Sequence, residues 1–353
     1  MVLLKIPTFL VNFVPFLVTF ATRKPSMNYI NLINNLLVPR ITEKALVLDL
    51  FAGCGGLSLG FEAAGFKTIG YEMNPDAAAT YNINLKGECF VEKLTLDFEY
   101  PQAQIVIGGP PCQPFSVGGN QNGINDSRNG FPFFIDAIKK IKPKVFLFEN
   151  VRGLLYTNKW YLDLIIQELE ALGYKTNCQL LNAVNYGVPQ NRERFFLVGH
   201  NAEFEFPEPE TKKNSVGDAI GDLMTTIPNE SKFLTKSQDD YIANYERASK
   251  CINPRDLYPD RPARTLTCRN LSAATGDMQR VKLPDGKRRR LLLKEAARLQ
   301  SFPDSFKFSG AETSQFYQIG NAVPPLLSYK IAIAIKECYN NKTIVIRKQL
   351  QLF

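Results

Sequence analysis

Histidine and tryptophan are almost absent from this chain: His200 is the only histidine and Trp160 the only tryptophan among its 353 residues. The seven cysteines have no regular spacing and include no Cys-x-x-Cys pair. With so few ligands of the zinc-binding type, we expect no metal site. A serine-histidine triad would have to use His200, and no Gly-x-Ser-x-Gly elbow accompanies it. An odd number of thiols without a disulfide pattern is typical of a reducing compartment, so we expect a cytoplasmic protein.

Long uninterrupted apolar runs are also scarce. The most apolar stretch, residues 1–22, is broken by Asn12 and Pro15 and is too short to span a bilayer comfortably. We interpret it as an upstream extension of a cytosolic protein, with Met27 as an alternative start, in preference to a membrane anchor. The sequence contains no internal repeat and no long low-complexity segment.

Positive charge, in contrast, is in excess. The formal net charge is +8 at pH 7 and the isoelectric point is about 9.0, which favours a polyanionic partner such as nucleic acid. A charge run is more often a solvated face than a binding site. Here the run lies outside the α/β core, which favours phosphate contacts. Its members are Arg261, Arg264, Arg269, Arg280, Lys282, Lys287, Arg288, Arg289 and Arg290.

Strand-like and helix-like segments alternate from residue 45 to residue 200. Short apolar runs bounded by turn residues predict strands at 45–50, 67–71, 105–107, 144–148, 175–181 and 195–199. Helical spacing predicts helices at 57–64, 131–141 and 162–172, one after Asn74, and later ones at 294–300 and 331–338. The alternation predicts an α/β fold with a parallel sheet and helices on both faces.

The first predicted strand leads into a glycine-rich turn, and an acid follows the second strand. The turn is Phe51-Ala52-Gly53-Cys54-Gly55-Gly56, and the acid is Glu72. Glycines allow backbone N–H groups to approach a ligand, and a carboxylate so placed accepts hydrogen bonds from both ribose hydroxyls. The turn is not a dinucleotide fingerprint, and it suits a nucleoside ligand without a pyrophosphate. A glycine turn that merely closes a strand onto a helix is the alternative.

A second irregular turn follows the strand at 105–107. It reads Gly108-Gly109-Pro110-Pro111-Cys112-Gln113-Pro114-Phe115-Ser116. Its prolines hold Cys112 at the carboxyl edge of the sheet, where open α/β sheets place their chemistry. The strand at 144–148 delivers Glu149 to the same edge. The polar, glycine-rich loop after Val117 is placed to close over a substrate, although a plain surface loop is the alternative.

Six segments together resemble the ordered motifs of DNA (cytosine-5)-methyltransferases of the bacterial restriction-modification type. They are Phe51 to Gly56, Pro110-Pro111-Cys112-Gln113, Glu149-Asn150-Val151, Gln190-Asn191-Arg192-Glu193-Arg194, Arg298-Leu299-Gln300-Ser301-Phe302-Pro303 and Gln318-Ile319-Gly320-Asn321-Ala322-Val323-Pro324-Pro325. They occur in the family's order, and the resemblance covers roughly residues 45 to 340.

The resemblance implies a Rossmann-like S-adenosylmethionine-dependent methyltransferase sheet with a smaller, irregular target-recognition domain. It implies an N-terminal extension at 1–40, a catalytic domain at 41–200, target recognition at 201–288, a return to the catalytic domain at 289–340, and a tail at 341–353. S-adenosylmethionine would contact Phe51, Ala52, Gly53, Gly55, Gly56, Leu57, Glu72, Met73, Asp97, Pro110 and Asn321.

The resemblance also implies a catalytic set: Cys112 as nucleophile, Glu149 on the cytosine edge, and Arg194, with Arg192 beside it, as the cationic partner. These choices make chemical sense, because a thiolate that adds to cytosine C6 makes C5 nucleophilic. In duplex DNA the base must first leave the stack. The expected partners are double-stranded DNA and a cognate restriction endonuclease encoded nearby, and the expected state is a monomer. The alternatives are an RNA cytosine-5 methyltransferase and a catalytically idle DNA-binding protein of the same fold.

Overall fold

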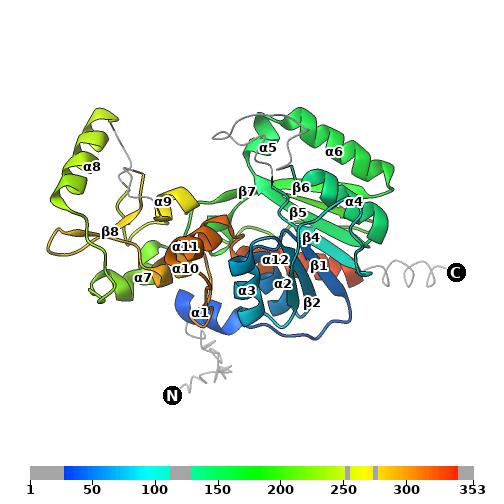
Figure 1. The fold of residues 1–353 in the computed structure, drawn as a ribbon, viewed down its shortest axis with the longest axis horizontal. Helices are drawn as coiled ribbons and strands as arrows, with labels where there is room; N and C mark the ends of the chain where they lie inside the picture. The colour runs from blue at the N-terminus through cyan, green and yellow to red at the C-terminus, as the bar shows by residue number, and fades with distance from the viewer. Residues whose placement is uncertain (1–27, 112–128, 251–254, 273–276, 341–353) are drawn as a thin grey trace, which may run out of the picture.

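The computed structural model describes residues 28–111, 129–250, 255–272 and 277–340. Cys112, the loop at 117–128, the first 27 residues and the tail at 341–353 lie outside the described residues. The chain forms a larger lobe around a sheet and a smaller lobe that carries α8, α9 and β8 (Figure 1). In this view α10 and α11 lie between the two lobes.

A seven-stranded sheet organises the larger lobe, in the order β3-β2-β1-β4-β5-β7-β6. Its strands are β1 (Leu46–Leu50), β2 (Lys67–Glu72), β3 (Glu88–Val91), β4 (Ile105–Gly108), β5 (Val145–Val151), β6 (Lys175–Asn182) and β7 (Glu193–His200). The central strands are apolar on both sides because both faces are covered. In β5, for example, Leu147 packs in the core of one face and Phe146 in that of the other.

The sheet is mixed, and the prediction of a parallel sheet is wrong for one strand, β7. β1 to β5 pair in parallel, whereas β7 runs antiparallel to both β5 and β6. The physical reason is that β6 and β7 are joined by a short turn that includes the 3₁₀ helix η2 (Ala183–Tyr186) and no crossover helix. A connection of this kind reverses the chain direction.

Helices cover both faces of the sheet, as predicted. On one side lie α2 (Gly56–Ala63), α3 (Pro75–Asn84) and α12 (Pro325–Asn340), and on the other α4 (Phe131–Ile141) and α6 (Lys159–Ala171). The short α5 (Gly153–Tyr156) precedes α6. The Asn74 side chain caps α3 by accepting from the Ala77 N–H at 3.1 Å, with Pro75 in the first turn.

The folded part of the chain begins earlier than the extension at 1–40 would suggest. Helix α1 (Tyr29–Leu36) packs its Ile33 side chain into the core, and the Tyr29 hydroxyl donates to the Arg298 carbonyl at 2.8 Å. α1 therefore belongs to the folded body.

The smaller lobe holds three helices and a two-stranded ribbon: α7 (Val216–Met224), α8 (Lys236–Ala248), α9 (Cys268–Ser272), β8 (Arg280–Lys282) and β9 (Arg288–Arg290). The chain then returns through α10 (Leu293–Leu299) and α11 (Glu312–Asn321) to α12. Across the described ranges, no helix is long and apolar enough to cross a membrane.

Candidate active site

Two parallel strands, β1 and β4, end together at one edge of the sheet, and their neighbour β5 continues past them to Val151. Leu50 of β1 pairs with Gly108 of β4, and Gly108 pairs with Phe148 of β5. The residues that follow these positions therefore emerge side by side, as expected for a site at the carboxyl edge of an open α/β sheet. A Cβ built on Gly109 would lie 3.4 Å from Glu149 Oε2, so the second irregular turn begins against the Glu149 carboxyl group.

The glycine-rich turn has the backbone that a close ligand requires. Phe51 and Gly53 both adopt positive φ, 62° and 55°, which is unusual for the non-glycine residue and marks a constrained turn. A Cβ built on Gly53 would meet no atom within 4 Å, so this side of the turn is open. Gly56 is closed in on the other side, where a Cβ would lie 2.6 Å from the Val323 carbonyl oxygen.

Glu72 is held in place by the same turn. Its Oε2 accepts from the Gly53 N–H at 2.9 Å and its Oε1 accepts from the Asn74 N–H at 2.8 Å. Each carboxylate oxygen can accept a second hydrogen bond. An oriented carboxylate beside an open backbone turn fits the ribose end of a nucleoside ligand, and these residues therefore fit S-adenosylmethionine.

A buried carboxyl group lies beneath the glycine turn. Asp49 is 1% exposed, its Oδ2 accepts from the Ser58 hydroxyl at 2.6 Å, and its Oδ1 has no hydrogen-bond partner among the residues that the structure describes. Burial raises the pKa of Asp49 to about 7, opposed by the Ser58 hydrogen bond. Sequence reasoning did not single out this residue, which reads as one polar position inside an apolar strand.

The other predicted cofactor residues differ in their surroundings. Ala52 and Leu57 are buried, whereas Met73 is 68% exposed. Asp97 is exposed and lies in a turn beyond the end of β3. Pro110 is buried, and its carbonyl oxygen accepts from the Asn150 side chain at 2.9 Å.

Asn321 ends helix α11 with its side chain engaged by the smaller lobe. Its Oδ1 accepts from the Cys268 thiol at 2.9 Å. The residues just after it reach the glycine turn, because a Cβ on Gly56 would lie 3.0 Å from the Ala322 side chain. The late motif thus touches both the cofactor turn and the smaller lobe.

Glu149 and Arg194 form a largely buried ion pair. Arg194 Nε lies 2.8 Å from Glu149 Oε1, and the two side chains are 14% and 12% exposed. The pair is built across the antiparallel β5–β7 ladder, in which Val151 opposes Arg194. Burial raises the pKa of Glu149 above its ordinary value, while Arg194 and then Arg192 act to lower it. A carboxyl group of this kind can change its protonation state when a bound ligand alters its hydrogen-bond partners.

The residues on either side of Cys112 are anchored to this edge. Asn150, directly after Glu149, holds the Pro110 carbonyl, and the Gly130 N–H donates to the Pro111 carbonyl at 2.9 Å. The described chain thus ends at Pro111 and resumes at Asn129, and the Gly130–Pro111 hydrogen bond holds these two ends together. The role of Asn150 was missed in the sequence, where it reads only as a neighbour of the acid.

Arg192 lies beside Arg194 in the chain but faces different partners. It is fully buried, and its guanidinium donates to the carbonyls of Leu266 at 2.7 Å, Gly320 at 2.9 Å and Ala322 at 3.0 Å. One side chain therefore joins the smaller lobe to the late motif. This arrangement gives Arg192 the contacts of a positioning residue.

Gln190 makes a second connection of the same kind, and sequence reasoning assigned it no role. Its side-chain oxygen accepts from the Leu266 N–H at 2.8 Å, and its amide nitrogen donates to Leu299 and to Gln300. The available signal was its spacing: Gln190 lies two residues before Arg192, so in extended backbone both side chains leave on the same side.

Part of the basic run in the smaller lobe is neutralised internally. Arg280 is fully buried and pairs with Asp256 and Glu246, each at 2.7 Å. Arg288 also pairs with Asp256, and Arg289 is fully buried on the Glu295 carboxylate. These cations hold the β8–β9 ribbon in place, so three members of the predicted phosphate-binding run are occupied by carboxylates.

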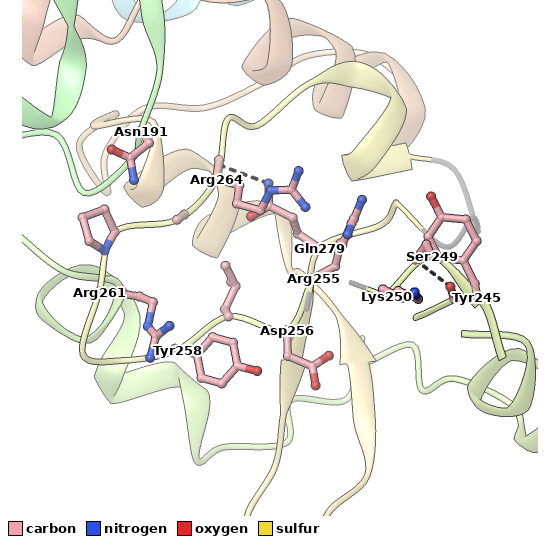
Figure 2. Close-up of a pocket in the computed structure, with 13 residues that line it drawn as sticks. Asn191, Tyr245, Ser249, Lys250, Arg255, Asp256, Tyr258, Arg261, Arg264 and Gln279 are labelled. Atoms are coloured by element: carbon pink, nitrogen blue, oxygen red, sulfur yellow. Dashed lines mark hydrogen bonds between the residues drawn. The ribbon is translucent and has the colours of Figure 1, made fainter. Parts of the chain in front are cut away.

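A polar cleft of about 700 Å³ opens on the smaller lobe where it meets the 189–192 segment (Figure 2). Its lining includes Arg255, Arg261 and Arg264, together with Tyr258 and Gln279. Figure 2 shows the three arginines spaced around the cleft and not gathered on one wall.

Comparison with known proteins places this architecture in a defined group. The family model described as C-5 cytosine-specific DNA methylase matches residues 46–337. The chain is 58% identical over 305 residues to the Type II methyltransferase M.AplI of Arthrospira platensis, covering 86% of this chain and 88% of that protein. It is 37% identical over 328 residues to the Type II methyltransferase M.FnuDI of Fusobacterium nucleatum, covering 84% of this chain and 95% of that protein.

Among solved structures, the fold is similar to that of a DNMT2 mutant from Spodoptera frugiperda. The TM-score is 0.65 at 17% sequence identity, over 83% of this chain and all of that one. This likeness concerns the fold.

Proposed function

The chain belongs to the family of C-5 cytosine-specific DNA methylases, and we propose that it methylates carbon 5 of a cytosine within a specific site of duplex DNA. The observation that carries the residue-level proposal is the Glu149–Arg194 ion pair at the sheet edge where the Pro110–Pro111 turn is anchored. We further propose that the enzyme protects DNA in a restriction-modification system with a partner endonuclease, and that it acts in the cytoplasm as a monomer.

S-adenosylmethionine, when bound, supplies an electrophilic methyl group. In this proposal the Phe51–Gly56 turn offers its open side and backbone donors, and Glu72 accepts hydrogen bonds from the ribose hydroxyls. The anchoring of Glu72 by Gly53 and Asn74 fixes the direction of those acceptors before the ligand arrives. An acceptor oriented in advance reduces the ordering that binding requires.

Cys112 is the proposed nucleophile, a role that depends on its sequence position directly after the anchored Pro111. Its thiolate adds to cytosine C6, forming an S–C6 bond while the electron pair of the C5–C6 double bond is displaced toward N3 and O2. The resulting enamine carries nucleophilic character at C5, so a C5–CH3 bond would form there as the S–CH3 bond of the sulfonium breaks and its electron pair remains on sulfur, leaving a neutral thioether. A base then removes the C5 proton, the C5–C6 double bond re-forms and the S–C6 bond breaks.

Glu149 manages the charge that this addition creates. Burial acts to raise its pKa, so the carboxyl group can take up a proton as the base binds, donate to cytosine N3 as the S–C6 bond forms and accept from the exocyclic amine. Arg194, now paired with that carboxyl, is placed to hold the O2 side of the base. Arg192 stays with its three carbonyls and keeps Arg194 in register.

The target base has to leave the duplex for this chemistry to occur. C6 lies inside the base stack, and eversion costs on the order of a few kcal/mol. Contacts between DNA and the smaller lobe are the available source of the compensating free energy. This division assigns recognition to the smaller lobe and chemistry to the sheet edge.

Bisulfite sequencing of DNA from cells that express the chain tests the proposal. We expect protected cytosines within one short recurring sequence, and none in cells that express Cys112→Ser. Glu149→Gln should retain S-adenosylmethionine binding while methyl transfer falls by a factor on the order of 10²–10⁴, because the proton donor is lost. Unprotected cytosines in the parent, or full protection with Cys112→Ser, would falsify the mechanism.

A further inference from the structure

The cations of the smaller lobe differ in whether a carboxylate already occupies them. Arg280, Arg288 and Arg289 are engaged as described above, and Arg255 lies 3.2 Å from Asp277. Arg264 is exposed, and in the described parts of the chain no carboxylate lies within ion-pair distance of it. Its charge is therefore available to an anion from outside the protein.

The backbone around Arg264 is unusually well fixed for an exposed position. Ala263 donates to the Pro189 carbonyl at 2.9 Å and accepts from the Asn191 N–H at 2.8 Å. The Thr265 hydroxyl donates to the Asn191 carbonyl at 2.7 Å. Residues on both sides of Arg264 are thus fastened to the segment that leads into β7.

The Gln279 side chain also fixes this backbone. Gln279, which is 2% exposed, donates its side-chain N–H to the carbonyls of both Arg264 and Thr265 at 3.2 Å (Figure 2). The Arg264 side chain is left to extend from this fixed backbone at the lining of the 700 Å³ cleft. A guanidinium presented in this way loses little backbone freedom on binding an anion.

The fixed segment also connects the cleft to the catalytic edge. Gln190 and Arg192 bond to the backbone of Leu266, and two residues after Arg192 the chain presents Arg194 to Glu149. An anion held by Arg264 would therefore lie in a defined register relative to the catalytic carboxyl group.

We propose that Arg264 is a positioning residue that grips a backbone phosphate of DNA in this cleft and sets the duplex in register with Glu149. Arg261, which is exposed and pairs only with its neighbour Asp260 among the described residues, adds a weaker contact to the same backbone. This inference rests on the proposed function, since it takes DNA as the substrate. It also excludes from the DNA contacts Arg280, Arg288 and Arg289, whose charges are occupied by buried carboxylates.

The test is the salt dependence of binding of a fluorescent duplex of random sequence, compared for the parent, Arg264→Gln and Arg264→Lys. Loss of one phosphate contact lowers the slope of log K against log salt by about 0.9, which corresponds to roughly eightfold weaker binding at 0.1 M salt. We expect this change for Arg264→Gln and recovery of the parent slope for Arg264→Lys, because lysine keeps the charge.

Lys287→Gln is the matched control, because it removes the same charge from an exposed position of the same lobe outside the cleft. Its slope should equal that of the parent. An unchanged slope for Arg264→Gln, or equal changes for Arg264→Gln and Lys287→Gln, overturns the proposal. A change in sequence preference without a change in slope also overturns it, since that result indicates contact with a base. Thermal unfolding of each variant establishes that it is folded.

Methylation of duplex DNA by the parent is measured in parallel. If the parent methylates DNA and the slope of Arg264→Gln is unchanged, the proposed phosphate contact of Arg264 is wrong and the proposed function stands. If the parent does not methylate DNA, the proposed function fails whatever the slopes.

Discussion

Replacing Asp49 with asparagine should change stability in a way that depends on pH. Asp49 is 1% exposed, and burial raises the pKa of its carboxyl group from an ordinary value of 3.8 to about 7. The folded state therefore binds a proton more tightly than the unfolded state does between these two values. Stability falls as pH rises through this window and is constant above it. Asparagine has the shape of the protonated acid and does not titrate.

The magnitude follows from the two pKa values. With values of about 3.8 and 7, proton binding adds roughly 3 kcal/mol to the free energy of unfolding at pH 5 and almost nothing at pH 8. The stability of Asp49→Asn relative to the parent should therefore rise by about 2–3 kcal/mol from pH 5 to pH 8.

Urea unfolding of the ligand-free proteins at several pH values measures this difference. The matched control is Asp240→Asn, which removes the same charge from an exposed position on α8 and leaves the buried carboxyl group in place. Parallel stability profiles for the parent and Asp49→Asn would show that the carboxyl group is already ionised at pH 5, which contradicts the effect assigned to burial.

Two further outcomes follow from the site. Glu72→Gln should weaken S-adenosylmethionine binding, measured by calorimetry, roughly 10- to 100-fold, because hydrogen bonds to a charged acceptor are worth about 1.5–3 kcal/mol. Glu92→Gln, at an exposed position nearby, is the control. Equal affinities of the parent and Glu72→Gln would exclude the ribose contact. Arg192→Lys should lower the free energy of unfolding by about 2–5 kcal/mol, because lysine cannot reach all three carbonyls of a buried site. Arg247→Lys, at an exposed position, should leave the free energy of unfolding unchanged. A parent-like unfolding temperature for Arg192→Lys would contradict its structural role.

Elements with local signals could be predicted closely from the sequence. Helix α4 has the predicted bounds of 131–141, because its apolar spacing begins beside a proline in the first turn. Helix α12 begins at Pro325 and not at 331, since its first turn packs its residues in a part of the core that only the folded chain reveals. The direction of β7 was beyond reach for another reason: alternation along a strand fixes which side chains face the core but not which way the chain runs.

The candidate site shows the same division between local and long-range information. Glu72 could be expected near the glycine turn, because both belong to one strand-turn-helix-strand unit. The contacts of Arg192 could not, since its partners lie 74 to 130 residues away. The sequence places Arg192 beside Arg194, and only tertiary contacts show that the two guanidinium groups have different partners.

Net charge predicts a class of partner, but it does not identify the residues that meet it. The run from Arg280 to Arg290 looks like the strongest phosphate-binding segment in the sequence, yet its carboxylate partners, such as Asp239 and Glu246, come from segments up to 49 residues away. Burying these cations without such partners would be prohibitive, so the pairing is a condition of the fold. What remains for DNA is the charge that folding leaves unpaired, and in the described cleft Arg264 carries it on the best-fixed backbone. A basic run inside an irregular domain is therefore evidence for an anionic partner only after its internal ion pairs have been subtracted.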